Sequence, residues 1–270
     1  MKTKIITVFV VLAVLPFVPA VAHADEPELT VPPETQAQSE NKGTGTQRKE
    51  HIDEIVVTAT RLKTSEREVG SSVTVITADQ IRQQQKITVL DVLKDVPALD
   101  VVQSRGPGTQ ASVFIRGAKS EHTLVLMDGV EMNDPSSAGR SFDFADLMVG
   151  NIERIEIVRG PQSTLYGSDA MGGVINIITK KGTGKPSGFV SAEGGSFKTF
   201  TERAGISGGT GLINYSFGIS RLDTDGISAA DEKDGNREKD GYENTTFSTR
   251  LGITPAKNFD ADLILRYINT

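Results

Sequence analysis

The 270-residue chain contains no cysteine, no tryptophan and only three histidines. The absence of cysteine excludes a disulfide framework and zinc sites built from thiolates, so packing alone must hold any core together. The formal net charge of −6 disfavours a nucleic-acid partner. Hydrophobic residues make up 37% of the chain, which is low for a helical membrane protein, and the 27 glycines follow no collagen repeat. This composition favours a fold rich in turns and β-structure.

The first 24 residues have the pattern of a secretory signal peptide. Lys2 and Lys4 precede an uncharged stretch at residues 5–21, and Ala22 and Ala24 match the small-x-small pattern of signal peptidase sites. The alternative is a membrane anchor, but two prolines interrupt a run that is short for a bilayer span. Cleavage after Ala24 would leave 246 of the 270 residues and a net charge of −8. An exported chain without cysteine indicates the envelope of a Gram-negative bacterium.

Local patterns divide the remaining chain into three parts. Residues 25–52 are polar and nearly free of large apolar side chains, so we expect a disordered tether. Residues up to 182 mix helix and strand patterns between glycines and prolines, which predicts one compact α+β domain. From residue 187 onward, apolar and polar residues alternate over long stretches, as in residues 213–220, 247–253 and 259–267.

Within the α+β domain, two helices have clear start signals. Thr77 begins a capping box and predicts a helix through Gln85, and Thr88 caps a second helix that stops before Pro97. Asp128-Gly129 is a hairpin-turn signal. Strands are predicted at residues 72–76, 99–103, 112–116, 123–127, 152–159 and 174–179.

The alternating segments after residue 187 predict strands with one apolar and one polar face. A soluble β-sandwich has such strands too, but the long strands with short turns and one long polar loop favour an outer-membrane β-barrel. Residues 187–270 have room for about five strands of roughly ten residues, whereas the smallest closed barrels need eight. We therefore expect an incomplete barrel in this chain.

Six segments resemble, in sequence order, the motifs of TonB-dependent outer-membrane transporters. The first, DEIVVTATR at residues 53–61, is similar to the TonB box, although an ordinary edge strand is the alternative interpretation. The others resemble plug-domain signatures and lie at residues 90–97, 114–117, 125–130, 152–167 and 172–179.

The resemblance implies an α+β plug domain followed by the first antiparallel strands of a transmembrane β-barrel. In such transporters the plug sits inside a 22-stranded barrel. TonB of the inner membrane, powered by the proton gradient, pulls on the box so that the bound ligand crosses the outer membrane. The implied division is a TonB box at residues 53–60, a plug at 61–182 and about five barrel strands at 187–270, in the outer membrane with the tether in the periplasm. The box residues are Asp53, Glu54, Ile55, Val56, Val57, Thr58 and Ala59, whose backbone is suited to pair with a sheet edge of TonB.

The chain most resembles the branch of that family that imports cobalamin. The similarity lies in residues 159–161 and 166–173 and in small polar apical loops, whose glycine and serine permit close approach to a large polar ligand. Iron-siderophore and haem receptors of the same family are the alternatives. A soluble periplasmic ligand-binding module is a further alternative, from another class. The predicted ligand-binding residues are Gly106, Gly108, Gln110, Asn133, Ser136, Ser137 and Ser141.

Two charged clusters complete the predictions. Glu153, Arg154 and Arg159 are expected to contact the barrel wall, because their charges alternate within a plug motif. Five aspartates in a long loop predict a calcium site, since hard oxygen ligands suit calcium, although acidic loops are usually only solvated. They are Asp223, Asp225, Asp231, Asp234 and Asp240. No other cofactor is expected, and the chain lacks catalytic motifs, so we do not expect an enzyme.

Overall fold

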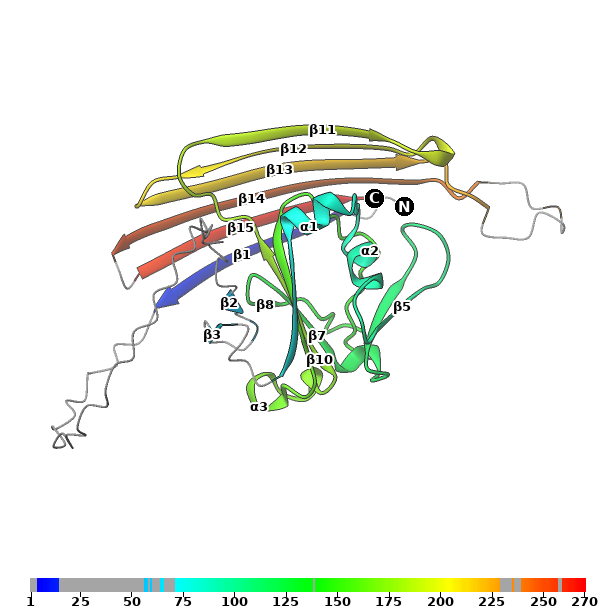
Figure 1. Ribbon diagram of the computed structural model, residues 1–270, viewed down its shortest axis with the longest axis horizontal. Helices are drawn as coiled ribbons and strands as arrows, with labels where there is room; N and C mark the ends of the chain where they lie inside the picture. Colours follow the sequence, from blue (N-terminus) through cyan, green and yellow to red (C-terminus); the bar gives the residue numbers. More distant parts are fainter. Residues whose placement is uncertain are drawn as a thin grey trace, which may run out of the picture.

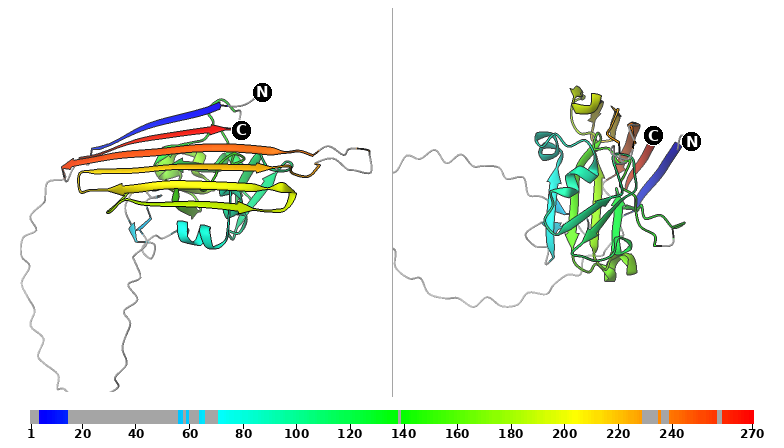
Figure 2. Two further views of the ribbon diagram at one scale, coloured as in Figure 1. Left: turned by 90° about the horizontal axis from the view of Figure 1, so that it is seen from above. Right: turned by 90° about the vertical axis from the view of Figure 1, so that its right-hand side faces the viewer.

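A computed structural model describes most of the chain (Figure 1). A long sheet curves along one side of a compact unit of shorter strands and helices (Figure 2). We call residues 71–181 of that unit the plug, and strands at residues 187–269 the wall. The described residues are 4–14, 56–57, 59, 64–65, 71–137, 139–228, 235, 239–256 and 259–270.

The plug is built on a mixed sheet with a two-stranded ribbon beside it. Its strands are β4 (Ser72–Thr77), β5 (Leu99–Gln103), β6 (Ala111–Ile115), β7 (Thr123–Met127), β8 (Val130–Glu131), β9 (Ile152–Arg159) and β10 (Gly173–Thr179). The sheet order is β4-β9-β10-β7-β8, with β7 parallel to β10, while β5 and β6 form the ribbon. All six predicted plug strands are confirmed to within one residue. The turn at Asp128 and Gly129, both with positive φ, joins β7 to β8 as predicted.

Both predicted helices are present with their predicted caps. They are α1 (Ala78–Gln83), capped by Thr77, and α2 (Val89–Lys94), capped by Thr88. The predicted end at Gln85 was wrong, because the backbone of Gln85 has a φ of 53° and leaves the right-handed helical region. Short helices were not predicted: α3 (Ser163–Tyr166), η2 (Ser120–His122), η3 (Ser168–Ala170) and, in the wall, η4 (Ser196–Lys198).

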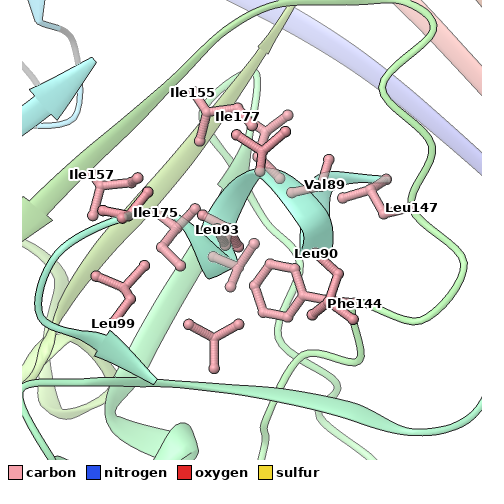
Figure 3. Packing of buried hydrophobic residues seen from close by; sticks show 14 of the residues in the cluster. Val89, Leu90, Leu93, Leu99, Phe144, Leu147, Ile155, Ile157, Ile175 and Ile177 are labelled. Atoms are coloured by element: carbon pink, nitrogen blue, oxygen red, sulfur yellow. The ribbon is translucent and has the colours of Figure 1, made fainter. Parts of the chain in front are cut away.

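Apolar side chains cover both faces of the plug sheet, which explains why its central strands are nearly continuous runs of Val, Ile and Leu. On one face, Ile155, Ile157, Ile175 and Ile177 pack against α2 and Phe144 (Figure 3). On the other face a smaller cluster contains Leu124, Leu126, Val158, Ala170, Val174 and Ala59, the last residue of the predicted TonB box. This second face also holds Glu156, a carboxylate with no exposed surface.

The wall contains the five long strands that the sequence predicts. They are β11 (Ser187–Gly194), β12 (Phe200–Gly209), β13 (Ile213–Thr224), β14 (Tyr242–Ala256) and β15 (Phe259–Asn269), each antiparallel to its neighbours in an open sheet. Polar side chains on the face toward the plug are buried, including Thr201, Asn214, Ser216, Ser220, Asn244, Thr246 and Arg266. Apolar side chains on the opposite face are exposed, including Val190, Ile206, Ile213, Phe217, Ile219, Phe247 and Leu251. This is the distribution of a barrel wall with lipid outside, not that of a sandwich with an apolar interior.

A sixth strand, β1 (Lys4–Val14), pairs along the full edge of β15, from Lys4 opposite Asn269 to Val14 opposite Phe259. The free edge of β15 offers unpaired backbone groups that an apolar, β-branched segment of equal length satisfies. This segment belongs to the predicted signal peptide. Cleavage at Ala24 stays a prediction, and Ala24 and the predicted tether lie outside the described residues. Among the described helices, none is long and apolar enough to cross a membrane.

Candidate functional site

The end of the predicted TonB box is fixed to the plug. Ala59 is fully buried, and its backbone N–H donates to Glu156 Oε2 at 2.8 Å. The hydroxyl of Tyr166 donates to the carbonyl oxygen of Ala59 at 3.0 Å. The sequence analysis quoted Glu156 and Tyr166 within plug motifs but did not assign them this role.

Upstream of Ala59, the box contributes a short strand. β2 (Val56–Val57) pairs antiparallel with β3 (Thr64–Ser65), so the box is extended at these two residues, whereas Ala59 lies in a turn. The other predicted box residues, Asp53, Glu54, Ile55 and Thr58, lie outside the described residues.

The first predicted ligand loop, residues 104–112, begins with a compact turn at residues 104–110 beside the wall and runs into β6. The ends of this turn are joined by the Ser104 N–H donating to the Gln110 carbonyl at 3.0 Å, and Gly108 has a φ of 76°. A Cβ at Gly108 would overlap the ring of Tyr242 in β14, so only glycine fits there. Beside this loop lies a cavity of about 370 Å³, whose lining includes Leu90, Pro107, Phe197, Leu222, Ile227 and Tyr242. Gly108 and Gln110 are exposed and Gly106 is half-buried.

The second predicted ligand loop, around Asn133 to Ser141, has a different anchor. Asn133 is buried, accepts from the Val125 N–H at 2.8 Å and donates to the Thr123 carbonyl at 3.2 Å. Its amide therefore positions the loop and does not face outward. The N–H and hydroxyl of Ser136 donate to Asp134, which lowers the pKa of that carboxyl.

Ser136 is exposed, and Ser137 and Ser141 are half-buried. Contact between these loop residues and a ligand stays a prediction.

Three arginine and lysine side chains join plug and wall. Arg250 of β14 lies between two carboxylates, with Nη1 3.1 Å from Asp128 Oδ1 of the plug and Nη2 2.9 Å from Asp262 Oδ2 of β15. Lys181 reaches Asp260 of β15 at 2.8 Å. Arg266, fully buried in the wall, donates to the Met148 carbonyl of the plug at 3.0 Å. The plug is thus held to the wall by charged groups, and burial raises the pKa of the Asp128 carboxyl while Arg250 opposes that rise.

Hydrogen bonds from uncharged wall side chains extend this interface toward the long loop. The Tyr242 hydroxyl donates to Asp146 Oδ1 at 2.7 Å, and the Asn244 amide donates to the Asp146 carbonyl oxygen at 3.1 Å. Burial raises the pKa of the Asp146 carboxyl, and the Tyr242 hydrogen bond opposes the rise. Further along, the Ser216 hydroxyl donates to Asn151 of the plug at 3.1 Å. These side chains fix the plug against two neighbouring strands, β13 and β14.

The residues predicted to contact the wall make their described contacts elsewhere. Arg154 pairs with Glu153 and Glu156, each at 2.9 Å, and Arg159 donates to the Ser72 hydroxyl at 3.0 Å. All these partners belong to the plug. Contact of Glu153, Arg154 and Arg159 with the barrel wall stays a prediction. A better sequence signal for the interface was available, because charged residues such as Arg250 and Arg266 lie on the polar face of otherwise alternating strands.

Comparisons with known proteins agree with this geometry. Residues 65–174 match the family model described as TonB-dependent Receptor Plug Domain. The chain is 46% identical over 144 residues to the "Vitamin B12 transporter BtuB" of Vibrio vulnificus strain CMCP6, in an alignment that covers 53% of this chain and 23% of that protein. The chain is thus similar to TonB-dependent receptors, and among them to the BtuB branch. Its match to the same transporter of Vibrio vulnificus strain YJ016, 45% over 127 residues, covers 47% of this chain and 20% of that protein.

Two solved receptor structures share the fold of this chain. The siderophore receptor PirA from Acinetobacter baumannii aligns with a TM-score of 0.59 and 26% identity, covering 79% of this chain and 33% of that chain. The ferripyoverdine receptor of Pseudomonas aeruginosa aligns with a TM-score of 0.64 and 20% identity, covering 79% and 27%. The chain thus has a plug and an open barrel wall, and its sequence is close to the BtuB branch. It is an outer-membrane protein with a periplasmic N-terminal plug, from a family of transporters and receptors that is not an enzyme family.

Of the described aspartates in the predicted calcium cluster, Asp223 and Asp225 have basic partners, and Asp240 is exposed. Asp225 lies 3.1 Å from Lys198 and 3.4 Å from Lys239, and Asp223 lies 3.4 Å from Arg221. Asp231 and Asp234 lie outside the described residues. Within the part of the chain that the structure describes, no group of three or more acidic, histidine or cysteine side chains is arranged to hold a metal ion. A calcium site in this loop therefore stays a prediction.

Proposed function

We propose that this receptor imports a corrinoid, most closely vitamin B12, across the outer membrane with energy supplied through TonB. The observation that carries the proposal is the 46% identity to a protein named as a vitamin B12 transporter, in an alignment of 144 residues. The chain covers only 23% of that protein. Substrate and partner are therefore assigned to the complete transporter of which these residues form the plug and part of the wall.

The apical loops are the part of the plug suited to bind such a ligand. Exposed Gly108, Gln110 and Ser136 offer backbone groups, an amide and a hydroxyl, which match the amide-rich periphery of a corrinoid. The cavity beside Gly108 adds an apolar surface next to these polar groups. In this proposal the ligand contacts both the first loop of the plug and Tyr242 of the wall strand β14. Ligand binding can therefore change the position of the plug relative to the wall.

On the periplasmic side, the box is the part suited to bind TonB. An extended segment gains affinity from main-chain hydrogen bonds with a sheet edge of a partner. Ligand binding must then change how available the box is, which requires different ligand affinities in the two states of the plug.

Uptake by the complete transporter tests the substrate. In a strain that lacks its own corrinoid receptor, the complete gene should restore accumulation of radiolabelled vitamin B12, and this accumulation should require TonB. Accumulation of ferric siderophores or haem under the same conditions, without that of vitamin B12, would contradict the corrinoid assignment and leave the transporter assignment intact.

A siderophore is the second candidate ligand. It is favoured by the alignment with the siderophore receptor PirA, which covers 79% of this chain with 26% identity. The uptake assay described above distinguishes the two ligands, because each is measured separately. A soluble binding module is disfavoured, because exposed Phe217, Ile219 and Phe247 on the outer face of the wall would meet water.

A further inference from the structure

We propose that Glu156 and Tyr166 form a latch that holds the last residue of the TonB box in the plug and limits how often the box is free for TonB. This inference rests on the proposed function, because it concerns the availability of the box during transport. It adds a role for two plug residues that no sequence pattern assigns.

The latch holds both hydrogen-bonding groups of one residue. The Ala59 N–H donates to the Glu156 carboxylate at 2.8 Å, and the Ala59 carbonyl accepts from the Tyr166 hydroxyl at 3.0 Å. Ala59 has no exposed surface and packs with Val158, Ala170 and other residues of the smaller core cluster. A residue held in this way has no backbone group left to offer a partner strand.

Three plug motifs converge on this point. Glu156 comes from β9, Tyr166 from the end of α3, and Asn176 of β10 donates to the same Glu156 oxygen at 3.3 Å. Glu156 has no exposed surface, so burial of its carboxyl group is costly unless these donors satisfy its oxygens. The convergence gives a physical reason for polar residues in strands whose neighbours are apolar.

Charged contacts connect the latch to the wall. Arg154 Nε donates to the other Glu156 oxygen at 2.9 Å, and Arg154 Nη1 donates to Glu153 at 2.9 Å. Glu153 Oε2 accepts the backbone N–H of Lys181 at 3.3 Å, and the ammonium of Lys181 pairs with Asp260 of β15 at 2.8 Å. A continuous chain of contacts therefore links the wall to the Glu156 carboxylate that holds the box. A movement of the plug relative to the wall can reach the latch through these contacts.

The latch and TonB compete for the same backbone groups. If TonB pairs with the box as an added strand, the register that includes Ala59 is available only after the latch opens. Hydrogen bonds to charged groups change equilibria by a factor of roughly ten to a hundred. If TonB binds only the state in which the latch is open, its affinity is proportional to the fraction of molecules in that state. A variant that raises this fraction should therefore raise the affinity for TonB by the same factor.

Spin labelling of the complete transporter tests the latch. The 270 residues contain no cysteine, so Val57→Cys introduces the only labelling site of this region. Without ligand, we expect the mobile fraction of the nitroxide to rise about tenfold in Glu156→Gln, which weakens a hydrogen bond to a charged group, and about fivefold in Tyr166→Phe, which removes a hydrogen bond between neutral groups. The affinity for a soluble TonB fragment should rise in parallel. Tyr215→Phe, which removes a hydroxyl from the wall, is the matched control and should change neither readout.

The use of two variants separates the loss of the latch from a folding defect. Glu156→Gln alters a buried charge, but Tyr166→Phe removes one hydroxyl, and plug unfolding by urea is measured for both. An unchanged label and unchanged TonB affinity in a folded Tyr166→Phe transporter would overturn the latch. Absence of corrinoid uptake by the wild-type transporter would instead contradict the proposed function, so the two failures are distinguishable.

Discussion

Removal of the Arg250 side chain should loosen the plug from the wall. Arg250, Asp128 and Asp262 have side chains only 12%, 3% and 9% exposed, so Arg250→Met leaves two buried carboxylates without their shared cation. Breaking a buried ion pair from one side costs about 3–5 kcal/mol, because an uncompensated charge stays buried. With a urea dependence of about 2 kcal/mol per M, the plug should unfold at a urea concentration about 2 M lower.

The neighbouring ion pair provides the control. Lys181 and Asp260 are 31% and 41% exposed, and Asp262, which lies 3.6 Å from Lys181, keeps Arg250 as its closer partner. Lys181→Met should therefore cost only about 0–1 kcal/mol. Plug unfolding in the complete transporter is followed by a fluorophore on a single cysteine introduced at the exposed Asp100. Neutralising both carboxylates in the Arg250→Met background should restore most of the lost stability. Equal, small shifts for Arg250→Met and Lys181→Met would refute the assignment of Arg250 as the main charged contact.

Three further predictions concern the box, the first loop and pH. Val56→Pro removes a backbone donor of the box and should abolish energised uptake while ligand binding is unchanged; retained uptake would contradict the box assignment. Gly108→Ala forces a Cβ toward the Tyr242 ring at a φ of 76° and should weaken vitamin B12 binding by roughly tenfold or more in equilibrium titrations. Gly211→Ala, in the wall and with open space around it, is the control and should leave binding unchanged. Burial raises the pKa of the Asp146 carboxyl group, so this group binds a proton more tightly in the folded state than in the unfolded state. The folded state therefore loses stability as the pH rises from about 4 through the raised pKa. Asp146→Asn should remove that loss, and an unchanged pH profile of urea unfolding would count against it.

Sequence signals that act over a few residues predicted most of the elements. Thr77 and Thr88 mark both helix starts because a cap needs only the next three residues. Alternation marks the wall strands, because each strand has one face toward the polar plug and one toward an apolar surround. β8 and α3 were missed because two and four residues are too short for any periodic signal.

The sites were harder to predict, because they join residues far apart in the chain. Ala59 and Glu156 are 97 positions apart, and Arg250 and Asp128 are 122 apart. No local pattern states which buried carboxylate accepts from which backbone donor. The pairing of residues 4–14 with β15 was unexpected for a similar reason, since an apolar N-terminal run has the same pattern as a signal peptide.

The central claim is that the wall has lipid on one face and the plug on the other. Single nitroxides along β13 in the complete transporter, reconstituted in bilayers, test it through their collision rates with dissolved oxygen, which concentrates in lipid. The account predicts high rates at exposed Phe217 and Ile219 and low rates at buried Ser216 and Ser220. Equal rates at all four positions, or high rates at the two serines, would contradict it.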